Sequence, residues 1–127
     1  MKRFEGVATI HYMLTDEDID DIMVCALEGG INYWCCAAEV VGDYLGEYAS
    51  EQISRGGTLK LYDIEDEDEV YELDLGKFLN GFKLWIENGY DNCGALQQDG
   101  TVDCCYIDAA CADEIIQLAL FEEIVFA

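Results

Sequence analysis

The sequence is poor in proline, histidine, basic residues and long apolar runs. It contains no proline, one histidine, and six lysine or arginine residues among 127. Because no linker-like stretch divides the chain, we expect one domain over residues 1–127. No apolar run approaches the roughly 18 residues of a membrane-spanning helix, and the first residues lack the continuous apolar segment of a signal peptide. We therefore expect a cytoplasmic protein with no membrane partner.

The scarcity of histidine also narrows the chemistry. The one histidine, His11, alternates with Thr9 on the outward side of an expected strand. Seven cysteines offer partners for a Cys–His nucleophile, but no pattern distinguishes one of them. The glycine-containing stretch SRGGT at residues 54–58 is too short for a phosphate-binding loop and follows an expected helix instead of opening one. We expect no enzyme, no catalytic residues and no cofactor.

The cysteines and paired acids do not form a metal-binding pattern. The cysteine count is odd and no secretion signal precedes it, so a disulfide framework is not expected. Zinc sites typically contain Cys-x-x-Cys pairs, whereas this sequence has two doublets in which the cysteines are direct neighbours. A calcium loop starting at Asp16 would have Asp21 in place of its turn glycine and Leu27 in place of its last glutamate, and one starting at Glu65 fails similarly. We expect no metal site, with the cysteines acting as buried, apolar-like thiols.

Acidic residues, by contrast, are abundant. Twenty-eight aspartates and glutamates against six basic residues give a formal charge of −22. Hydrophobic residues make up 52% of the chain, which favours a folded domain over a disordered acidic segment. A much smaller charge would keep a domain of this size in solution, and −22 causes self-repulsion in the folded state. The acidic residues therefore either only keep the protein solvated or bind a partner molecule.

The hydrophobic pattern predicts an α+β fold, a single compact domain with a mostly antiparallel sheet and about four helices. Thr15 is the expected N-cap of the first helix, and Asp108 is the expected N-cap of the last. Apolar residues recur at helical spacing in residues 16–28, 43–55 and 75–86, and again after Asp108.

Strands are predicted from alternating or β-branched stretches. Asp99-Gly100 is a typical hairpin turn, here between residues 94–98 and 101–107. The other expected strands are residues 7–14, part of 31–41, 58–64 and 69–74, the last two joined as a hairpin around an acidic linker.

Two runs of acidic residues are the candidate functional sites. Duplex DNA carries one negative charge per roughly 1.7 Å of helix axis, and closely spaced carboxylates can imitate such a phosphate track. We interpret the runs as contact sets for a partner with a basic nucleic-acid-binding groove, such as a host nuclease, attracted most strongly at low salt. The chain itself would not bind nucleic acid. The two sets are Asp16, Glu17, Asp18, Asp20 and Asp21, and Glu65, Asp66, Glu67, Asp68 and Glu69.

A second hypothesis comes from the few basic residues. Arg55 would bind a phosphate, and the rings of Tyr33 and Trp34 would stack on a base, which together would form a nucleotide pocket. Such a protein would sequester a nucleotide without turning it over. The alternative is that Tyr33 and Trp34 belong to the core and that Arg55 pairs with an acid such as Glu51.

The stretches GGINYW and GEYASEQISRGGTLKLYD resemble a family of small acidic proteins from phages and mobile elements of Firmicutes. The resemblance continues through KFLNGFKLWIENG to ADEIIQLALFEEIVF and covers most of the chain. The family has no assigned activity. The resemblance implies a bacterial host and a counter-defence setting, in which anti-CRISPR and anti-restriction proteins act as DNA mimics and others bind immune signalling nucleotides. The sequence leaves open whether the chain forms a homo-oligomer.

Overall fold

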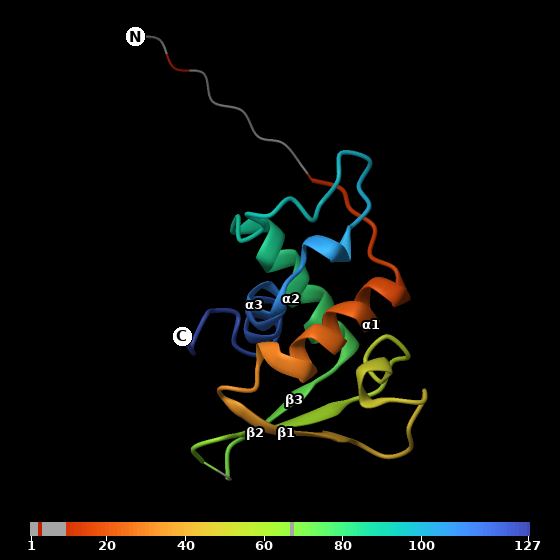
Figure 1. The fold of residues 1–127 in the computed structure, drawn as a ribbon, viewed down its shortest axis with the longest axis vertical. Coiled ribbons are helices and arrows are strands. Elements are labelled where there is room, and N and C mark those ends of the chain that lie inside the picture. Colours follow the sequence, from red (N-terminus) through yellow and green to blue (C-terminus); the bar gives the residue numbers. More distant parts are fainter. Residues whose placement is uncertain (1–2, 4–9, 67) are drawn as a thin grey trace.

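The computed structural model describes residues 3, 10–66 and 68–127 (Figure 1). Its first helix, α1 (Asp16–Cys25), begins at the expected N-cap. The Thr15 hydroxyl accepts a hydrogen bond from the Asp18 N–H at 3.1 Å, and the Asp18 carboxylate accepts one from the Thr15 N–H at 3.0 Å. This reciprocal pair satisfies two N–H groups that a helix start leaves free. Helix α1 continues directly into one π-helical turn, η1 (Ala26–Gly30).

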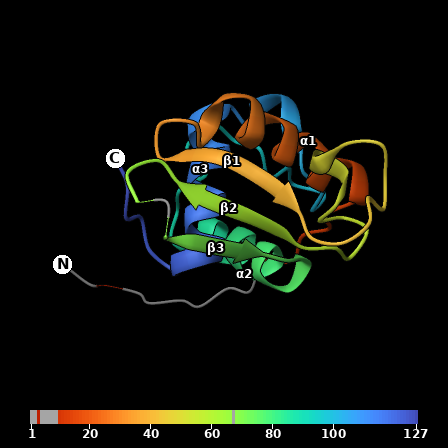
Figure 2. The ribbon, with the colours of Figure 1, turned by 90° about the horizontal axis from the view of Figure 1, so that it is seen from below.

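Three antiparallel strands form a sheet in the order β1-β2-β3. They are β1 (Cys35–Val40), β2 (Leu59–Asp63) and β3 (Val70–Leu73). Leu59 and Leu61 of β2 point into the core and are fully buried. Lys60 and Tyr62, which alternate with them, lie on the opposite face, and Figure 2 shows that the helices cover only the leucine side. The expected β2–β3 hairpin around the acidic linker is confirmed.

Two further helices, α2 (Leu75–Glu87) and α3 (Ala109–Phe121), pack against each other behind the sheet (Figure 2). Asp74 and Asp108 cap their first turns, the latter as the sequence predicts. Gly81 of α2 lies directly against α3, because a methyl group there would stand 2.5 Å from the Ala119 nitrogen. The absence of a side chain therefore sets the close approach of the two helices.

The core lies between the helices and the leucine side of the sheet. Its largest fully buried side chains are Trp34, Trp85, Phe78, Phe82, Ile22, Met23, Ile31, Ile53, Leu59, Leu61, Leu73 and Ile115. They come from β2, β3, the three helices and the turns between these elements, so one hydrophobic cluster joins the described residues into a single compact α+β domain.

The described residues contain three α-helices, so the expected number of about four is wrong. Residues 43–55 form turns and a short 3-10 helix, Ala49–Glu51, in place of the predicted helix. Here side chains bind the backbone groups that a helix would use. Glu51 accepts from the N–H groups of Glu47 and Tyr48, and Gln52 accepts from the N–H of Leu45. Such local bonds compete with helix formation.

Three predicted strands, 7–14, 94–98 and 101–107, also differ from the structure. Residues 7–9 of the expected strand 7–14 lie outside the described residues, and residues 10–14 form no strand but bond the Met13 N–H to the Gly100 carbonyl at 2.7 Å. The turn at Asp99-Gly100 is present, yet only one bridge, Leu96 to Val102, forms beside it. The carboxylate of Asp91 accepts from three N–H groups of residues 94–96, and this turn-like geometry prevents a longer ladder.

Within the described ranges, no helix combines the length and the apolar character needed to cross a bilayer.

Candidate functional site

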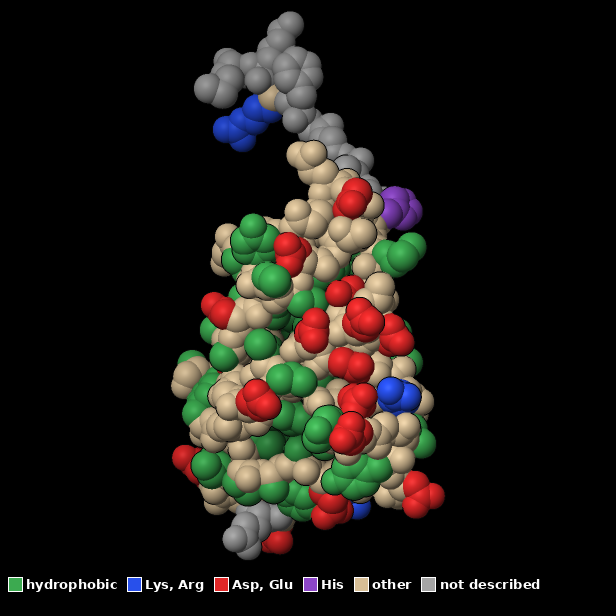
Figure 3. All heavy atoms as spheres, turned by 45° about the vertical axis from the view of Figure 1, so that its right-hand side comes forward, with side chains coloured by type: hydrophobic (Ala, Val, Ile, Leu, Met, Phe, Trp, Pro, Cys, Tyr) green, Lys and Arg blue, Asp and Glu red, His purple; other side chains and the backbone are tan. Residues whose placement is uncertain are grey.

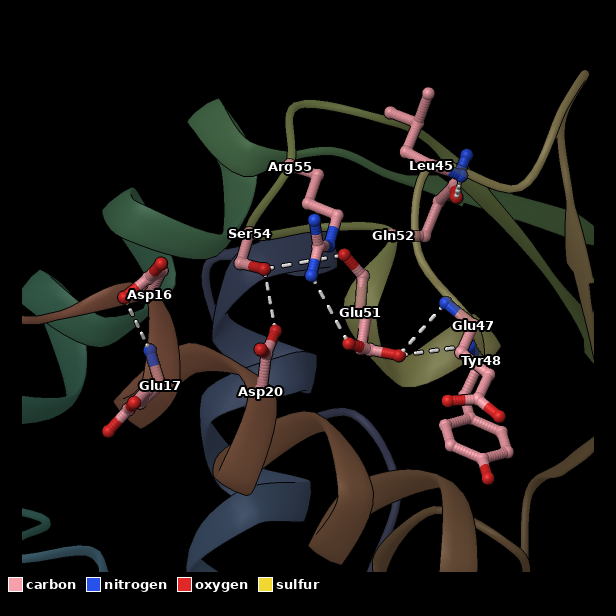
Figure 4. A network of polar contacts seen from close by, with 10 residues as sticks. All are labelled: Asp16, Glu17, Asp20, Leu45, Glu47, Tyr48, Glu51, Gln52, Ser54 and Arg55. Carbon is pink, nitrogen blue, oxygen red and sulfur yellow. Dashed lines mark hydrogen bonds and ion pairs between the residues drawn. The ribbon is translucent and has the colours of Figure 1, made fainter.

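Helix α1 carries the first acidic run on its outer side. Asp16, Glu17 and Asp21 are exposed, while Asp18 and Asp20 are partly buried. Asp18 belongs to the N-terminal cap, and Asp20 accepts a 2.6 Å hydrogen bond from the Ser54 hydroxyl (Figure 4). Both therefore hold the helix in place and still contribute negative charge to the surface.

The turns that replace the predicted second helix add acids to this side. Figure 4 shows Glu51 beside Asp20, with Glu47 on the next turn beyond it, and Figure 3 shows acidic side chains gathered along this side of the molecule. Hydrogen bonds from the backbone N–H of Tyr48, then of Glu47, together with Arg55, hold the pKa of Glu51 below its usual value. We call the set of Asp16, Glu17, Asp18, Asp20, Asp21, Glu47 and Glu51 the α1 acidic face.

Arg55 is the cation within this face. Its guanidinium lies 3.3 Å from the Glu51 carboxylate, the pairing that the sequence offered as an alternative to phosphate binding. Half of the arginine side chain is exposed, so this ion pair contributes little to stability. The face keeps a large excess of negative charge.

A hollow of about 640 Å³ borders the α1 acidic face. Asp18 and Asp21 line one side, Asp103 lines the other, and Cys25 and Cys104 lie between them. Burial, followed by the charge of Asp18, raises the pKa of the Cys104 thiol to about 12. Cys104 therefore stays a neutral thiol and is no candidate nucleophile.

The second acidic run lies elsewhere. Glu65, Asp66, Asp68 and Glu69 are exposed in the β2–β3 loop, and Glu67 lies outside the described residues. Figures 1 and 2 place this loop at one side of the molecule and the start of α1 at the other. The two runs are separate surfaces and do not form one continuous track.

The buried Asp63 anchors this loop. Its carboxylate accepts hydrogen bonds from the N–H groups of Glu65 and Asp66 and from the Tyr71 hydroxyl. These bonds, led by the Glu65 N–H, hold the pKa of Asp63 below its usual value. One acid of this region thus maintains the fold, and the neighbouring acids extend into solvent.

Tyr33 and Trp34 lie in a polar cluster around Asp113 of α3. The Asp113 carboxylate accepts hydrogen bonds from the Tyr33 hydroxyl at 2.6 Å, the Trp34 indole at 2.8 Å and the Gln117 amide at 3.0 Å. The Trp34 ring is 2% exposed and is already stacked on Phe126, with 4.9 Å between centroids. A nucleotide base would have to displace the phenylalanine.

Arg55 does not join this cluster. The adjoining pocket of about 200 Å³ is lined by Tyr33, Trp34, Phe126, Asp63 and Glu65 among others, without Arg55. The structure thus brings Tyr33 and Trp34 together but leaves the phosphate-binding residue of that hypothesis on the α1 side. Two acids at the pocket also repel a phosphate.

The sequence did not reveal Asp113 and Gln117 as partners of Tyr33 and Trp34, because the partners are far apart along the chain. Asp113 and Trp34, for example, are 79 positions apart. Gln117 also binds the C-terminal segment. Its side-chain oxygen accepts hydrogen bonds from the N–H groups of Val125 and Phe126, at 2.8 Å each. A side chain therefore fastens the C-terminal segment to α3.

All seven cysteines are free thiols. The sulfur atoms of Cys93 and Cys111 are 3.8 Å apart, and burial raises the pKa of Cys111 to about 12. In the part of the chain that the structure describes, no three His, Cys, Asp or Glu side chains are grouped so that they could hold a metal ion.

The fold and surface together define a small α+β domain with a strongly acidic helix face. Comparison with protein-family models, curated proteins and solved structures finds no match for this chain.

Proposed function

We propose that the protein is a non-enzymatic inhibitor that presents the α1 acidic face to the basic nucleic-acid-binding groove of a partner protein. The partner would be a host nuclease or a similar defence protein, in the cytoplasm of a bacterium. This role is that of an anti-restriction or anti-CRISPR DNA mimic, and the resemblance to small acidic phage proteins supports the setting.

The charge density of α1 carries the proposal. Five carboxylates occur within the six residues from Asp16 to Asp21. At about 1.5 Å of rise per residue, this stretch covers about 9 Å of helix axis, or about one charge per 1.8 Å. Duplex DNA has about one charge per 1.7 Å. A basic groove that accommodates phosphates would therefore meet a similar linear density of negative charge.

The helix also holds these charges at fixed positions. The N-terminal cap orders the first turn of α1, and the Asp20–Ser54 hydrogen bond attaches the helix to the turns that follow the short 3-10 helix. Ordering the acidic residues then costs little when the partner binds, because the fold has already ordered them. The loop acids at residues 65–69 are proposed as a second, weaker contact set.

The test compares two variants with equal charge changes. Asp16→Asn/Glu17→Gln/Asp21→Asn removes three charges from α1, and Glu65→Gln/Asp66→Asn/Glu69→Gln removes three from the loop. Native mass spectrometry of the wild-type protein isolated from a bacterial lysate at low salt would identify the partner. Anisotropy of labelled duplex DNA bound to that partner would then measure competition by each variant.

We expect the α1 variant to compete at least about tenfold more weakly, since each lost charge removes a contact to a basic side chain. The difference should shrink as salt rises. If both variants lost the same amount of competing ability, the binding would be explained by general attraction to the net charge of the protein. Competition that neither variant changes would refute the DNA-mimic proposal.

The nucleotide-binding alternative has no comparable observation, since Arg55 lies away from Tyr33 and Trp34. A nucleotide of defined mass bound to the isolated protein would restore it. In that case Arg55→Ala should abolish nucleotide binding, while the α1 variant should bind the nucleotide normally.

A further inference from the structure

Strand β1 forms one edge of the sheet, so one side of its backbone pairs with no other strand of the described residues (Figure 2). The Val41 N–H bonds to the Thr58 carbonyl at 3.1 Å. Since backbone bonds alternate along an antiparallel pair, Ala37 and Glu39 also face β2, while the N–H and C=O groups of Ala38 and Val40 point outward. The edge thus offers two donors and two acceptors to another chain.

A hollow of about 510 Å³ lies beside this edge. One wall comes from η1 and the following turn, through Leu27 and Ile31, and the other comes from β1, through Cys36 and Ala38. A helical wall facing an exposed strand edge is the arrangement in which extended peptides bind as an added strand. The apolar wall would receive alternate side chains of such a peptide, and the β1 backbone would bind its main chain.

The charges around the hollow determine which peptide fits. Exposed acids lie next in sequence to residues of its lining, with Glu28 after Leu27 and Glu65 after Ile64. Glu39, which follows Ala38, points to the open face of the sheet opposite Lys60. No lysine or arginine of the described residues lines it. A second copy of the chain would bring another net charge of −22 to the same edge, which opposes self-association.

We propose that the β1 edge binds an extended cationic segment of a partner protein as a fourth strand. Its apolar residues would pack against Leu27 and Ala38 on the helix side. Its lysines or arginines, which alternate with them, would lie on the open face of the sheet, where Glu39 is exposed. This site is separate from the α1 acidic face and does not depend on the function proposed for it.

A labelled peptide, Lys-Val-Arg-Val-Lys-Val-Arg, serves as the probe, and its affinity is measured by fluorescence anisotropy. The decisive variant is Ala38→Pro, which removes an outward N–H while Ala37 and Glu39 keep their bonds to β2. We expect its affinity for the peptide to fall about tenfold or more, since a backbone bond is lost and the proline ring blocks the edge. Circular dichroism and urea unfolding establish that the variant is folded.

A second variant makes the test independent of the proline. Glu28→Gln/Glu39→Gln/Glu65→Gln should also weaken peptide binding, and the α1 variant with the same charge change should bind nearly as well as wild type. Equal weakening by both charge variants would show unspecific attraction and overturn the proposal. In the wild-type complex, we expect the amides of Ala38 and Val40 to become protected from hydrogen exchange.

Two other results would contradict the proposal. One is an unchanged affinity for Ala38→Pro in a folded protein. The other is a wild-type dimer in sedimentation experiments that Ala38→Pro dissociates, which would assign the edge to a second copy of the chain.

Discussion

Aspartate has two contrasting roles in this molecule, one in the cluster around Trp34 and one on the α1 acidic face. The carboxylate of Asp113 is buried and accepts hydrogen bonds from three side chains. Asp21 is exposed, and among the described residues Asp16 accepts one hydrogen bond, from the N–H of its neighbour Glu17. The fold uses most of the bonding capacity of the first carboxylate and leaves most of that of the others to solvent or a partner. The number of acids in a sequence therefore does not tell how many are available for binding.

The largest expected effect comes from removing the buried carboxylate. Asp113→Ala would leave the buried Trp34 indole without its acceptor, while Tyr33 and Gln117 would keep the Phe126 carbonyl. We expect the free energy of unfolding to fall by about 3 kcal/mol. Urea unfolding measures this loss. Asp21→Ala is the matched control and should change it by less than about 0.5 kcal/mol. Similar losses in both variants would remove the distinction between the two roles.

High pH tests the same cluster through a single bond. Burial and the hydrogen bond to Asp113 raise the pKa of Tyr33 to about 12. An unfolded tyrosine loses its proton near about pH 10. The stability contributed by Tyr33 should therefore be fully present below pH 10 and be lost as the pH rises toward about 12.

Urea unfolding across this pH range, with tyrosinate absorption as a second readout, measures the effect. Tyr33→Phe should make stability less dependent on pH in this range and remove one late-titrating tyrosine. Tyr71, whose pKa is also raised to about 12, should remain as another. An unchanged titration in Tyr33→Phe would show that the Tyr33 bond to Asp113 is absent.

A smaller loss is expected at the start of α1. Thr15→Ala removes the hydroxyl that accepts from the Asp18 N–H, and the free energy of unfolding should decrease by about 1 kcal/mol. Thr15→Ser keeps the acceptor and should be close to wild type. If the Asp18 amide exchanges its hydrogen faster in Thr15→Ala but not in Thr15→Ser, the loss of stability arises at this cap. Equal stability of all three proteins would show that the cap does not hold this helix.

The smallest effect should have the opposite sign. Glu17 and Asp21 are like-charged residues four positions apart on α1, and both are exposed. Asp21→Asn should raise the free energy of unfolding by about 0.2–0.5 kcal/mol at low salt, because it removes their repulsion and Asp21 lies beyond the first turn, where the helix dipole favours acids. Glu123→Gln, at an exposed residue beyond α3, is the control. A loss of stability in Asp21→Asn would mean that the carboxylate makes a favourable contact instead.

Local signals in the sequence predicted the elements that local forces determine. Thr15 and Asp108 act as helix caps where expected, and alternating residues mark β2 and β3. The wrong helix prediction, over 43–55, arose where Glu51 and Gln52 bond to nearby backbone groups, which a hydrophobic period does not reveal. The sequence also identified the acids of α1, but not that Glu47 and Glu51 would lie beside them, because that placement depends on the turn.

Gly81, where α2 meets α3, has a consequence for how related chains would differ. Surface acids exchange easily between aspartate and glutamate and tolerate insertions, so sequences with this charge can diverge quickly while keeping the same surface. Even alanine at position 81 would collide with the Ala119 backbone. A distant relative would therefore be recognised by a glycine in one helix and a small residue in the next, at matching spacing, better than by its acidic runs.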